Sequence, residues 1–289
     1  MNRVVITTNS ACMFADQAKE KGITIIPFHI IIEGKDYLDP EVDMDSLYAL
    51  LDRKESLPTT APFTMAECLQ AWQRLSQSAE AILHISMTQA FTAAYTVALQ
   101  AQETARAKLP NTKIELIDSR TAGSGAGLIA LEAAEMAAEG KDMTQVVGFI
   151  TDVIPKLSSL SMRDTLLYLD KGGRIFEAKS WAEAEHKLCF RAIVEIDDRS
   201  EGVTKPVARA KTRKQAMEKM VEIAEERAKN GKLHILVGHT RAAEEAEELK
   251  NMFESNFKCD KIYVYDESAT VAVFNGRNLI DVAFYATPY

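Results

Sequence analysis

The stretch that decides the fold is KIELIDSRTAGSGAGLIALEAAEMAAEG, residues 113–140. Its first six residues have the apolar, β-prone character of a strand, and residues 124–139 form an alanine-rich helical pattern that ends at Gly140. A strand that leads through a short loop into a helix is the repeating unit of parallel sheets covered on both faces. The stretch therefore predicts an α/β fold.

The same alternation of strand and helix continues toward the N-terminus. Strands are predicted at 3–8, 23–32 and 81–87, and a long helix from about residue 90 to 108. We therefore predict a parallel-sheet, Rossmann-like domain over residues 1–155. Beyond residue 156 the strands become more local, which predicts a second α/β domain with a mixed or antiparallel sheet over residues 156–289. Because no linker separates the two, we expect a cleft between them.

Composition excludes several classes of function. The 289 residues carry a formal net charge of −8, which argues against a nucleic-acid surface or an anionic-membrane surface. No uncharged apolar run is long enough to span a bilayer, and the first residues lack the apolar core and cleavage site of a signal peptide. The four cysteines are far apart, as expected for free thiols in a reducing compartment. We expect a cytoplasmic protein without stable membrane insertion.

Sequence patterns typical of catalysis or metal binding are absent. The chain contains no H-E-x-x-H, G-x-S-x-G or Walker sequence, and His234 and His239 fall on opposite faces of one predicted strand. We therefore expect structural histidines, no catalytic residue and no metal. The glycines of residues 123–127 miss the G-x-G-x-x-G spacing, and we expect them to let a helix approach a sheet closely.

Two short polar segments are candidates for ligand binding. LPTTAPF, residues 57–63, places Thr59 and Thr60 between two prolines, where they either cap the next helix or offer hydroxyl and N–H groups to an anion. YLDKGGRI, residues 168–175, reads as a short helix that ends at two glycines, with Arg174 exposed just beyond. That arginine either is only part of the turn that ends the helix or pairs with an anionic partner.

Together these segments resemble the DegV family of bacterial fatty-acid-binding proteins, which have the EDD fold. The most specific matches are LPTTAPFT, IDSRTAGSGAGL and KGGRI, which occur in the family's order. The resemblance implies a two-domain fold that binds one long-chain fatty acid, with its tail in the first domain and its carboxylate at the cleft. It also implies that a separate fatty-acid kinase phosphorylates that carboxylate for phospholipid synthesis. The protein itself would be a carrier without cofactor, not an enzyme.

The resemblance also implies which residues meet the head group. Thr59 and Thr60 match the family's threonine motif, and Thr92 with Ala93 matches a turn in which the family has a serine. Arg174 matches the arginine implicated in docking to the partner.

Two departures from the family concern the head group directly. Phe274 stands where the family has a histidine beside the carboxylate, and Arg277 follows close by. The loss of the histidine either weakens recognition of the carboxylate or leaves Arg277 to supply the cation from a neighbouring position. The N-terminal Asp-Ser-Thr of the family is here Thr8-Asn9-Ser10.

These departures leave three functions open. The first is the fatty-acid carrier. The second is a binder of another apolar or lipid-like ligand, and the third is a small-molecule transferase or hydrolase that uses Thr8, Asn9, Ser10 and Arg277 in the cleft. Apolar residues of 23–32 and of the helices either line the ligand pocket or form ordinary core. The helical candidates are Leu99, Leu128, Leu131 and Met136.

Overall fold

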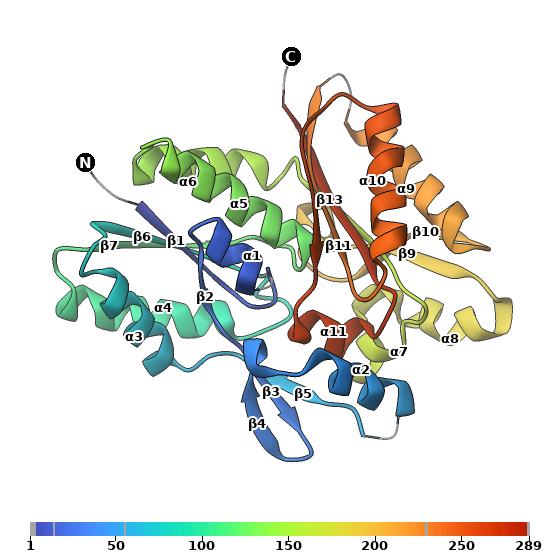
Figure 1. The fold of residues 1–289 in the computed structure, drawn as a ribbon, viewed down its shortest axis with the longest axis horizontal. Coiled ribbons are helices and arrows are strands. Elements are labelled where there is room, and N and C mark those ends of the chain that lie inside the picture. Colours follow the sequence, from blue (N-terminus) through green and yellow to red (C-terminus); the bar gives the residue numbers. More distant parts are fainter. Residues whose placement is uncertain (1–3, 14, 55, 229–230, 288–289) are drawn as a thin grey trace.

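A computed structural model describes residues 4–13, 15–54, 56–228 and 231–287 (Figure 1). The N-terminal part is built on a four-stranded sheet of order β2-β1-β6-β7, in which every neighbouring pair is parallel. Its strands are β1 (Val4–Asn9), β2 (Thr24–Ile26), β6 (Ala81–Ser86) and β7 (Lys113–Asp118). The predicted α/β architecture is confirmed.

Helices cover both faces of this sheet (Figure 1). One face carries α3 (Met65–Leu75) and α4 (Ala94–Lys108), and the other carries α5 (Ser124–Ala138) and α6 (Met143–Val153); the short α1 (Ala15–Glu20) follows β1. Local sequence sets the helix starts. The Thr64 hydroxyl accepts the Glu67 N–H at 3.2 Å while the Glu67 carboxylate accepts the Thr64 N–H at 2.7 Å, which is a capping box. Thr64, not Thr60, is therefore the helix cap.

The C-terminal part is built on a six-stranded mixed sheet of order β10-β9-β8-β13-β11-β12. Only β11 and β12 pair in parallel among these described strands; the other neighbouring pairs are antiparallel, as predicted for this half. The helices α9 (Arg213–Arg227) and α10 (Ala243–Asn256) cover its outer face (Figure 1). The strands are β8 (Ser158–Met162), β9 (Arg191–Glu195), β10 (Lys205–Ala210), β11 (Lys232–His239), β12 (Cys259–Asp266) and β13 (Ile280–Thr287).

Helix α5 lies between the two sheets and joins their cores. It contacts β1 and β6 on one side and β11 and β13 on the other, and residues 124–134 are all buried. A helix that is apolar on all sides has to be enclosed in this way. A Cβ on Gly127 would lie 2.6 Å from the Cys12 carbonyl oxygen and 3.0 Å from Leu236 Cδ2. The prediction that these glycines permit close packing is confirmed.

The prediction of one strand over residues 23–32 is wrong. The segment divides into β2 and β3 (His29–Ile32), which belong to different sheets, with Pro27 and Phe28 between them. Proline lacks the N–H that a central strand needs, so pairing in the parallel sheet stops there. Strand β3 pairs instead with β4 (Lys35–Leu38) and β5 (Thr59–Ala61) in a small antiparallel sheet.

This small sheet reaches across to the C-terminal half. With α2 (Met44–Arg53) it packs against α7 (Leu167–Lys171) and α11 (Ala269–Asn275) (Figure 1). The shared core includes Ile30, Leu51, Tyr168 and Val273. A ligand site at this junction can therefore draw on both halves of the chain.

Several elements are absent from the sequence predictions, among them α8 (Lys179–Leu188) and the three 3₁₀ turns, Asp39–Glu41, Phe176–Ala178 and Asp198–Ser200. Helix α11 is the instructive case, because ATVAVFN is rich in β-branched residues. Its start is held by capping: Ser268 Oγ accepts the Val271 N–H at 3.4 Å, and the buried Asp39 carboxylate accepts the Thr270 N–H at 2.7 Å. Tertiary contacts thus override local propensity.

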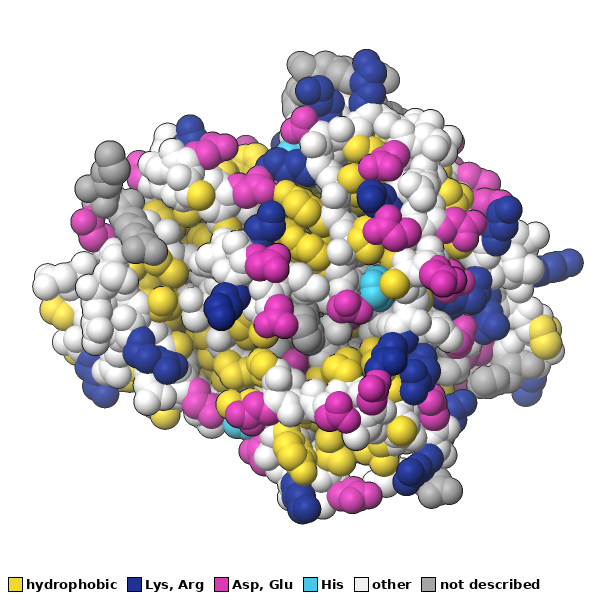
Figure 2. Space-filling model, in the orientation of Figure 1, with side chains coloured by type: hydrophobic (Ala, Val, Ile, Leu, Met, Phe, Trp, Pro, Cys, Tyr) yellow, Lys and Arg dark blue, Asp and Glu magenta, His cyan; other side chains and the backbone are white. Residues whose placement is uncertain are grey.

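The described residues contain no helix that is both long and apolar enough to cross a membrane. On the face shown in Figure 2, basic and acidic side chains are interspersed.

Candidate ligand pocket at the junction of the three sheets

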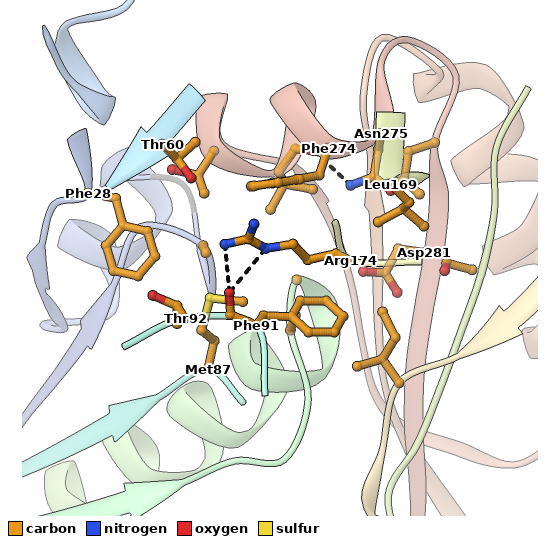
Figure 3. Close-up of a pocket in the computed structure, with 18 of the residues that line it drawn as sticks. Phe28, Thr60, Met87, Phe91, Thr92, Leu169, Arg174, Phe274, Asn275 and Asp281 are labelled. Carbon is orange, nitrogen blue, oxygen red and sulfur yellow. Dashed lines mark hydrogen bonds between the residues drawn. The ribbon is translucent and has the colours of Figure 1, made fainter. Parts of the chain in front are cut away.

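A pocket lies where the small sheet, the parallel sheet and the C-terminal half meet (Figure 3). Most of its lining is apolar. The apolar side chains are those of Ala11, Phe28, Pro62, Met87, Phe91, Ala122, Leu169, Ile196, Val271, Phe274 and Leu279. The polar side chains are those of Thr60, Thr92, Ser159, Ser161, Arg163, Arg174, Thr270, Asn275 and Asp281. An apolar pocket with a few convergent polar groups is typical of a site for an amphipathic small molecule.

Strand β5 turns only one of its two threonines into the pocket. Thr60 lines it, whereas Thr59 is exposed and is not part of the lining. The reason is the two-residue period of a strand, which sends neighbouring side chains to opposite faces. Thr60 pairs in register with Ile30, whose side chain is fully buried. The structure thus brings Thr60 to the candidate site and leaves Thr59 outside it.

Thr92 enters the pocket from the loop that precedes α4. Its Oγ1 accepts the Ala94 N–H at 3.3 Å, so the hydroxyl is held at the first turn of that helix. Ala93 is exposed and outside the lining. In Figure 3, Thr60, Thr92 and Phe28 lie on the same side of the pocket. Two hydroxyls predicted as head-group contacts are therefore brought together from distant segments.

Arg174 is half-buried in the pocket wall, so the prediction that it is exposed is wrong. Its Nε and Nη2 donate to the Phe91 carbonyl oxygen at 3.1 and 2.8 Å, and its Nη1 donates to the Gly172 carbonyl oxygen. The guanidinium also lies 4.9 Å from the centre of the Phe274 ring. Burial lowers the pKa of Arg174. Figure 3 shows the guanidinium extending toward the side occupied by Thr60 and Thr92.

Phe274 lines the pocket as part of α11, at the place expected from the sequence. Its ring leaves no room for a side chain at Gly172, where a Cβ would lie 2.5 Å from Phe274 Cδ1. The ring and the guanidinium of Arg174 therefore form one face of the site. Phe274 contributes an apolar surface and a cation–π contact at this position.

Arg277 does not line the pocket, contrary to expectation. Its Nε pairs with Asp52 Oδ2 at 2.9 Å, and its guanidinium lies 4.8 Å from the centre of the Tyr48 ring. Helix α11 ends before Arg277, and the glycine turn at Gly276 carries the chain away from the pocket. The cation beside the threonines is Arg174 instead.

The polar set of the transferase or hydrolase alternative is also not assembled. Thr8, Asn9 and Ser10 are buried and are not part of the pocket lining. Thr8 donates to the Ile85 carbonyl oxygen at 2.6 Å, and Ser10 accepts the Phe28 N–H at 3.0 Å. These side chains hold the strand end and its neighbours together.

Most of the helical residues considered for the pocket belong to ordinary core. Leu128 and Leu131 are buried in the cluster shared by the two large sheets, Met136 packs against that cluster, and Leu99 is 39% exposed on α4. None of the four lines the pocket. The apolar lining of the pocket is drawn instead from loops and from the short helices α7 and α11.

Sequence reasoning missed a polar group in the pocket made of Ser159, Ser161, Arg163 and Asp281. We call these four residues the distal polar cluster, since Figure 3 shows Asp281 on the side of the pocket opposite Thr60. The available signal was the spacing of 159, 161 and 163, which puts three polar side chains on one face of β8 and its extension. Asp281 stands alone in an otherwise apolar strand.

Two buried acids sit side by side at the start of α5. Asp281 Oδ2 accepts the Ser124 N–H at 3.0 Å, and Glu267 Oε1 accepts the Ser124 hydroxyl at 3.2 Å. Burial is the main cause that raises the pKa of Asp281 to about 7, while the Ser124 N–H and Arg163 oppose it. Burial, reinforced by the Asp281 charge, also raises the pKa of Glu267. Like charges this close disfavour ionisation of both acids together.

The family model that describes an uncharacterised protein of the DegV family matches residues 3–287. This chain belongs to the DegV family. Among curated relatives, a DegV domain-containing protein of Clostridium perfringens is 27% identical over 281 residues, 97% of each chain. One of Caldanaerobacter subterraneus is 32% identical over 182 residues, 62% of this chain and 63% of the relative.

Solved DegV structures share the fold of this DegV protein. A Thermus thermophilus DegV family protein described by its fatty acid binding matches with a TM-score of 0.88 and 18% identity, over 99% of this chain and 100% of the other. A Eubacterium eligens DegV family protein loaded with heptadecanoic acid matches with a TM-score of 0.87 and 19% identity, over 98% and 100%. The fold prediction is thereby confirmed.

Two buried histidines of this DegV protein, His84 and His234, contact other side chains of the core. The His84 ring nitrogen Nδ1 lies 3.0 Å from Thr7 Oγ1, and burial lowers the pKa of His84 to about 3. His234 Nδ1 lies 2.6 Å from Glu132 Oε1, on the far side of α5 from the parallel sheet. No group of three or more metal-ligating side chains occurs within the residues that the structure describes.

Proposed function

We propose that this DegV protein binds one long-chain fatty acid, with its carboxylate at Thr60, Thr92 and Arg174. The observation that carries the proposal is the placement of one guanidinium and two hydroxyls on the same side of a mostly apolar pocket (Figure 3). A guanidinium has five N–H donors, and the contacts to Phe91 and Gly172 leave N–H groups for a ligand. Fatty-acid binding described for solved DegV proteins supports the same choice.

The two ends of such a ligand contribute differently to binding. Burial of each methylene is worth about 0.8 kcal/mol, so a long acyl chain contributes about 10 kcal/mol before ordering costs. A hydrogen bond to a charged group adds about 1.5–3 kcal/mol. The chain therefore supplies most of the affinity, and the threonines with Arg174 orient the ligand.

Direct identification of the bound lipid tests the proposal. Natively purified protein is extracted with organic solvent and the extract is analysed by mass spectrometry, and stripped protein is then titrated with long-chain fatty acids. We expect a fatty acid at one molecule per chain and saturable rebinding. An empty pocket together with no rebinding of any fatty acid would contradict the proposal.

We further propose that the protein is a cytoplasmic carrier that presents the carboxylate to a separate fatty-acid kinase. Beside Arg174, the exposed Lys171 and Phe176 offer a cationic and apolar surface next to the proposed head-group site. The test is acyl phosphate formation by a cognate kinase with ATP at saturating fatty acid, so that lipid affinity does not limit the rate. We expect Arg174→Ala to lower that rate, and an unchanged rate would remove Arg174 from docking.

A further inference from the structure

The distal polar cluster has no role in binding a simple fatty acid. Ser159, Ser161, Arg163 and Asp281 are each at most 6% exposed, yet all four line the pocket. Three of them belong to β8 or directly follow it, and Asp281 belongs to the neighbouring β13. Figure 3 shows Asp281 across the pocket from Thr60 and Thr92. A methyl-terminated acyl chain offers none of them a hydrogen bond.

The cluster is only partly satisfied within the protein. Arg163 Nη2 donates to Ser161 Oγ, but Arg163 Nε and Nη1 have no hydrogen-bond partner among the described residues. Asp281 Oδ1 likewise has none in that part of the chain, although Asp281 Oδ2 accepts from Ser124. Buried polar atoms are normally paired, so these donors and this acceptor indicate a missing group.

The charges around the cluster limit which chemical group of a ligand can pair with its free polar atoms. Arg163 carries the positive charge, and Asp281 with its neighbour Glu267 already supplies two acids, held next to each other through Ser124. A second carboxylate on the ligand would be a third acid beside two whose ionisation is already disfavoured. A hydroxyl adds no charge, and it can accept from the guanidinium while it donates to the carboxylate.

We propose that the distal polar cluster binds a hydroxyl carried on the outer part of the acyl chain, so that the preferred ligand is a hydroxy fatty acid. This inference rests on the proposed function, because it assumes a fatty acid whose carboxylate lies at Thr60, Thr92 and Arg174. It assigns a ligand class to Arg163 and Asp281, which line the same pocket and carry buried polar atoms without a hydrogen-bond partner among the described residues.

The test compares matched ligands on stripped protein. Octadecanoic acid and its derivatives hydroxylated at successive outer positions compete with a fluorescent fatty acid for the wild-type chain. At the position that reaches the cluster, we expect the hydroxy acid to bind about tenfold more tightly than the parent, as for one hydrogen bond to a charged group. In Arg163→Met this preference should vanish, while the parent acid binds at least as tightly as before.

A control at the proposed carboxylate site separates binding of the carboxylate from binding of the hydroxyl. Thr60→Val should weaken the parent and the hydroxy acid by the same factor and leave their ratio intact. If Arg163→Met does not fold, as judged by circular dichroism and melting, Asp281→Asn replaces it and should also reduce the preference. Equal binding of parent and hydroxy acids to wild type, or a preference that survives Arg163→Met, would overturn the inference alone. Failure of every fatty acid to bind would overturn the proposed function as well.

Discussion

Arg174 donates two hydrogen bonds to the carbonyl oxygen of Phe91, from Nε at 3.1 Å and from Nη2 at 2.8 Å. Phe91 directly precedes Thr92, so this contact joins the loop after α7 to the loop that carries the proposed head-group hydroxyl. The Phe176 ring stacks on the Phe91 ring with centroids 5.5 Å apart and reinforces the same junction. The side of the pocket that carries Thr60, Thr92 and Arg174 is therefore assembled from both halves of the chain.

Removal of the Arg174 guanidinium should weaken both this junction and ligand binding. Arg174→Ala is expected to lower the free energy of unfolding by about 1 kcal/mol and fatty-acid affinity by about tenfold, since it removes charged hydrogen bonds. Denaturant unfolding and lipid titration measure the two effects. The matched control is Lys171→Ala, which removes an equal charge from an exposed neighbour. Equal losses in the two variants would contradict the specific role of Arg174.

The two adjacent threonines should differ sharply in their effect on the ligand. Thr60→Val keeps the shape of the side chain but removes the hydroxyl that faces the pocket, and we expect about tenfold weaker fatty-acid binding. Thr59→Val alters the exposed face of the same strand and should leave affinity within about twofold of wild type. Both affinities come from the same displacement titration. A larger effect at Thr59 than at Thr60 would reverse the assignment.

Packing of α5 against both sheets should make Gly127 intolerant of substitution. A Cβ there would meet the backbone carbonyl oxygen of Cys12 at 2.6 Å, and backbone cannot move aside cheaply. We expect Gly127→Ala to destabilise the protein by about 1–3 kcal/mol through overpacking.

The control for this effect lies in the neighbouring helix. Gly148 is inside α6, and a Cβ there meets nothing within 4 Å, so Gly148→Ala should be neutral or stabilise by about 0.5–1 kcal/mol. Thermal and denaturant unfolding give both values. Similar stability changes in the two variants would show that α5 does not depend on close approach.

The buried acid pair should make stability depend on pH. The pKa of Asp281 is raised from 3.8 to about 7, so the folded protein holds a proton that the unfolded chain releases. The stabilisation from this group is complete below pH 3.8 and is lost as pH rises to about 7. In Asp281→Asn, the loss of stability with rising pH that comes from Asp281 should disappear. Removal of this neighbouring acid should also lower the pKa of Glu267, which should reduce the pH dependence of stability further.

Melting temperatures of both proteins, measured from about pH 4 to about pH 8, give the comparison. The difference between wild type and Asp281→Asn isolates the buried acids, because all other titrating groups are common to both. A constant difference across this range would show that Asp281 ionises in the folded protein as readily as in the unfolded chain.

Parts of the site were predictable because they depend on local pattern. Alternating strand and helix segments predicted the α/β fold, and the run of glycines at residues 123–127 predicted the close packing of α5. Thr60 and Thr92 were identified as head-group candidates from motifs, and the structure places both in one pocket. Thr60 was preferred over Thr59 from the motif, but local sequence does not show which way a three-residue strand faces, and the two were separated only when β5 was paired with β3.

By itself, the sequence determined the alternation of elements, the glycines that α5 needs and the family. Only the tertiary structure decided that Arg174 enters the pocket while Arg277 pairs with Asp52, and that Arg163 and Asp281 line one pocket. The physical reason is range. Periodicity reports which face of an element is buried. The residues that pack on that face come from segments distant in the sequence, and their positions depend on the packing of the whole core.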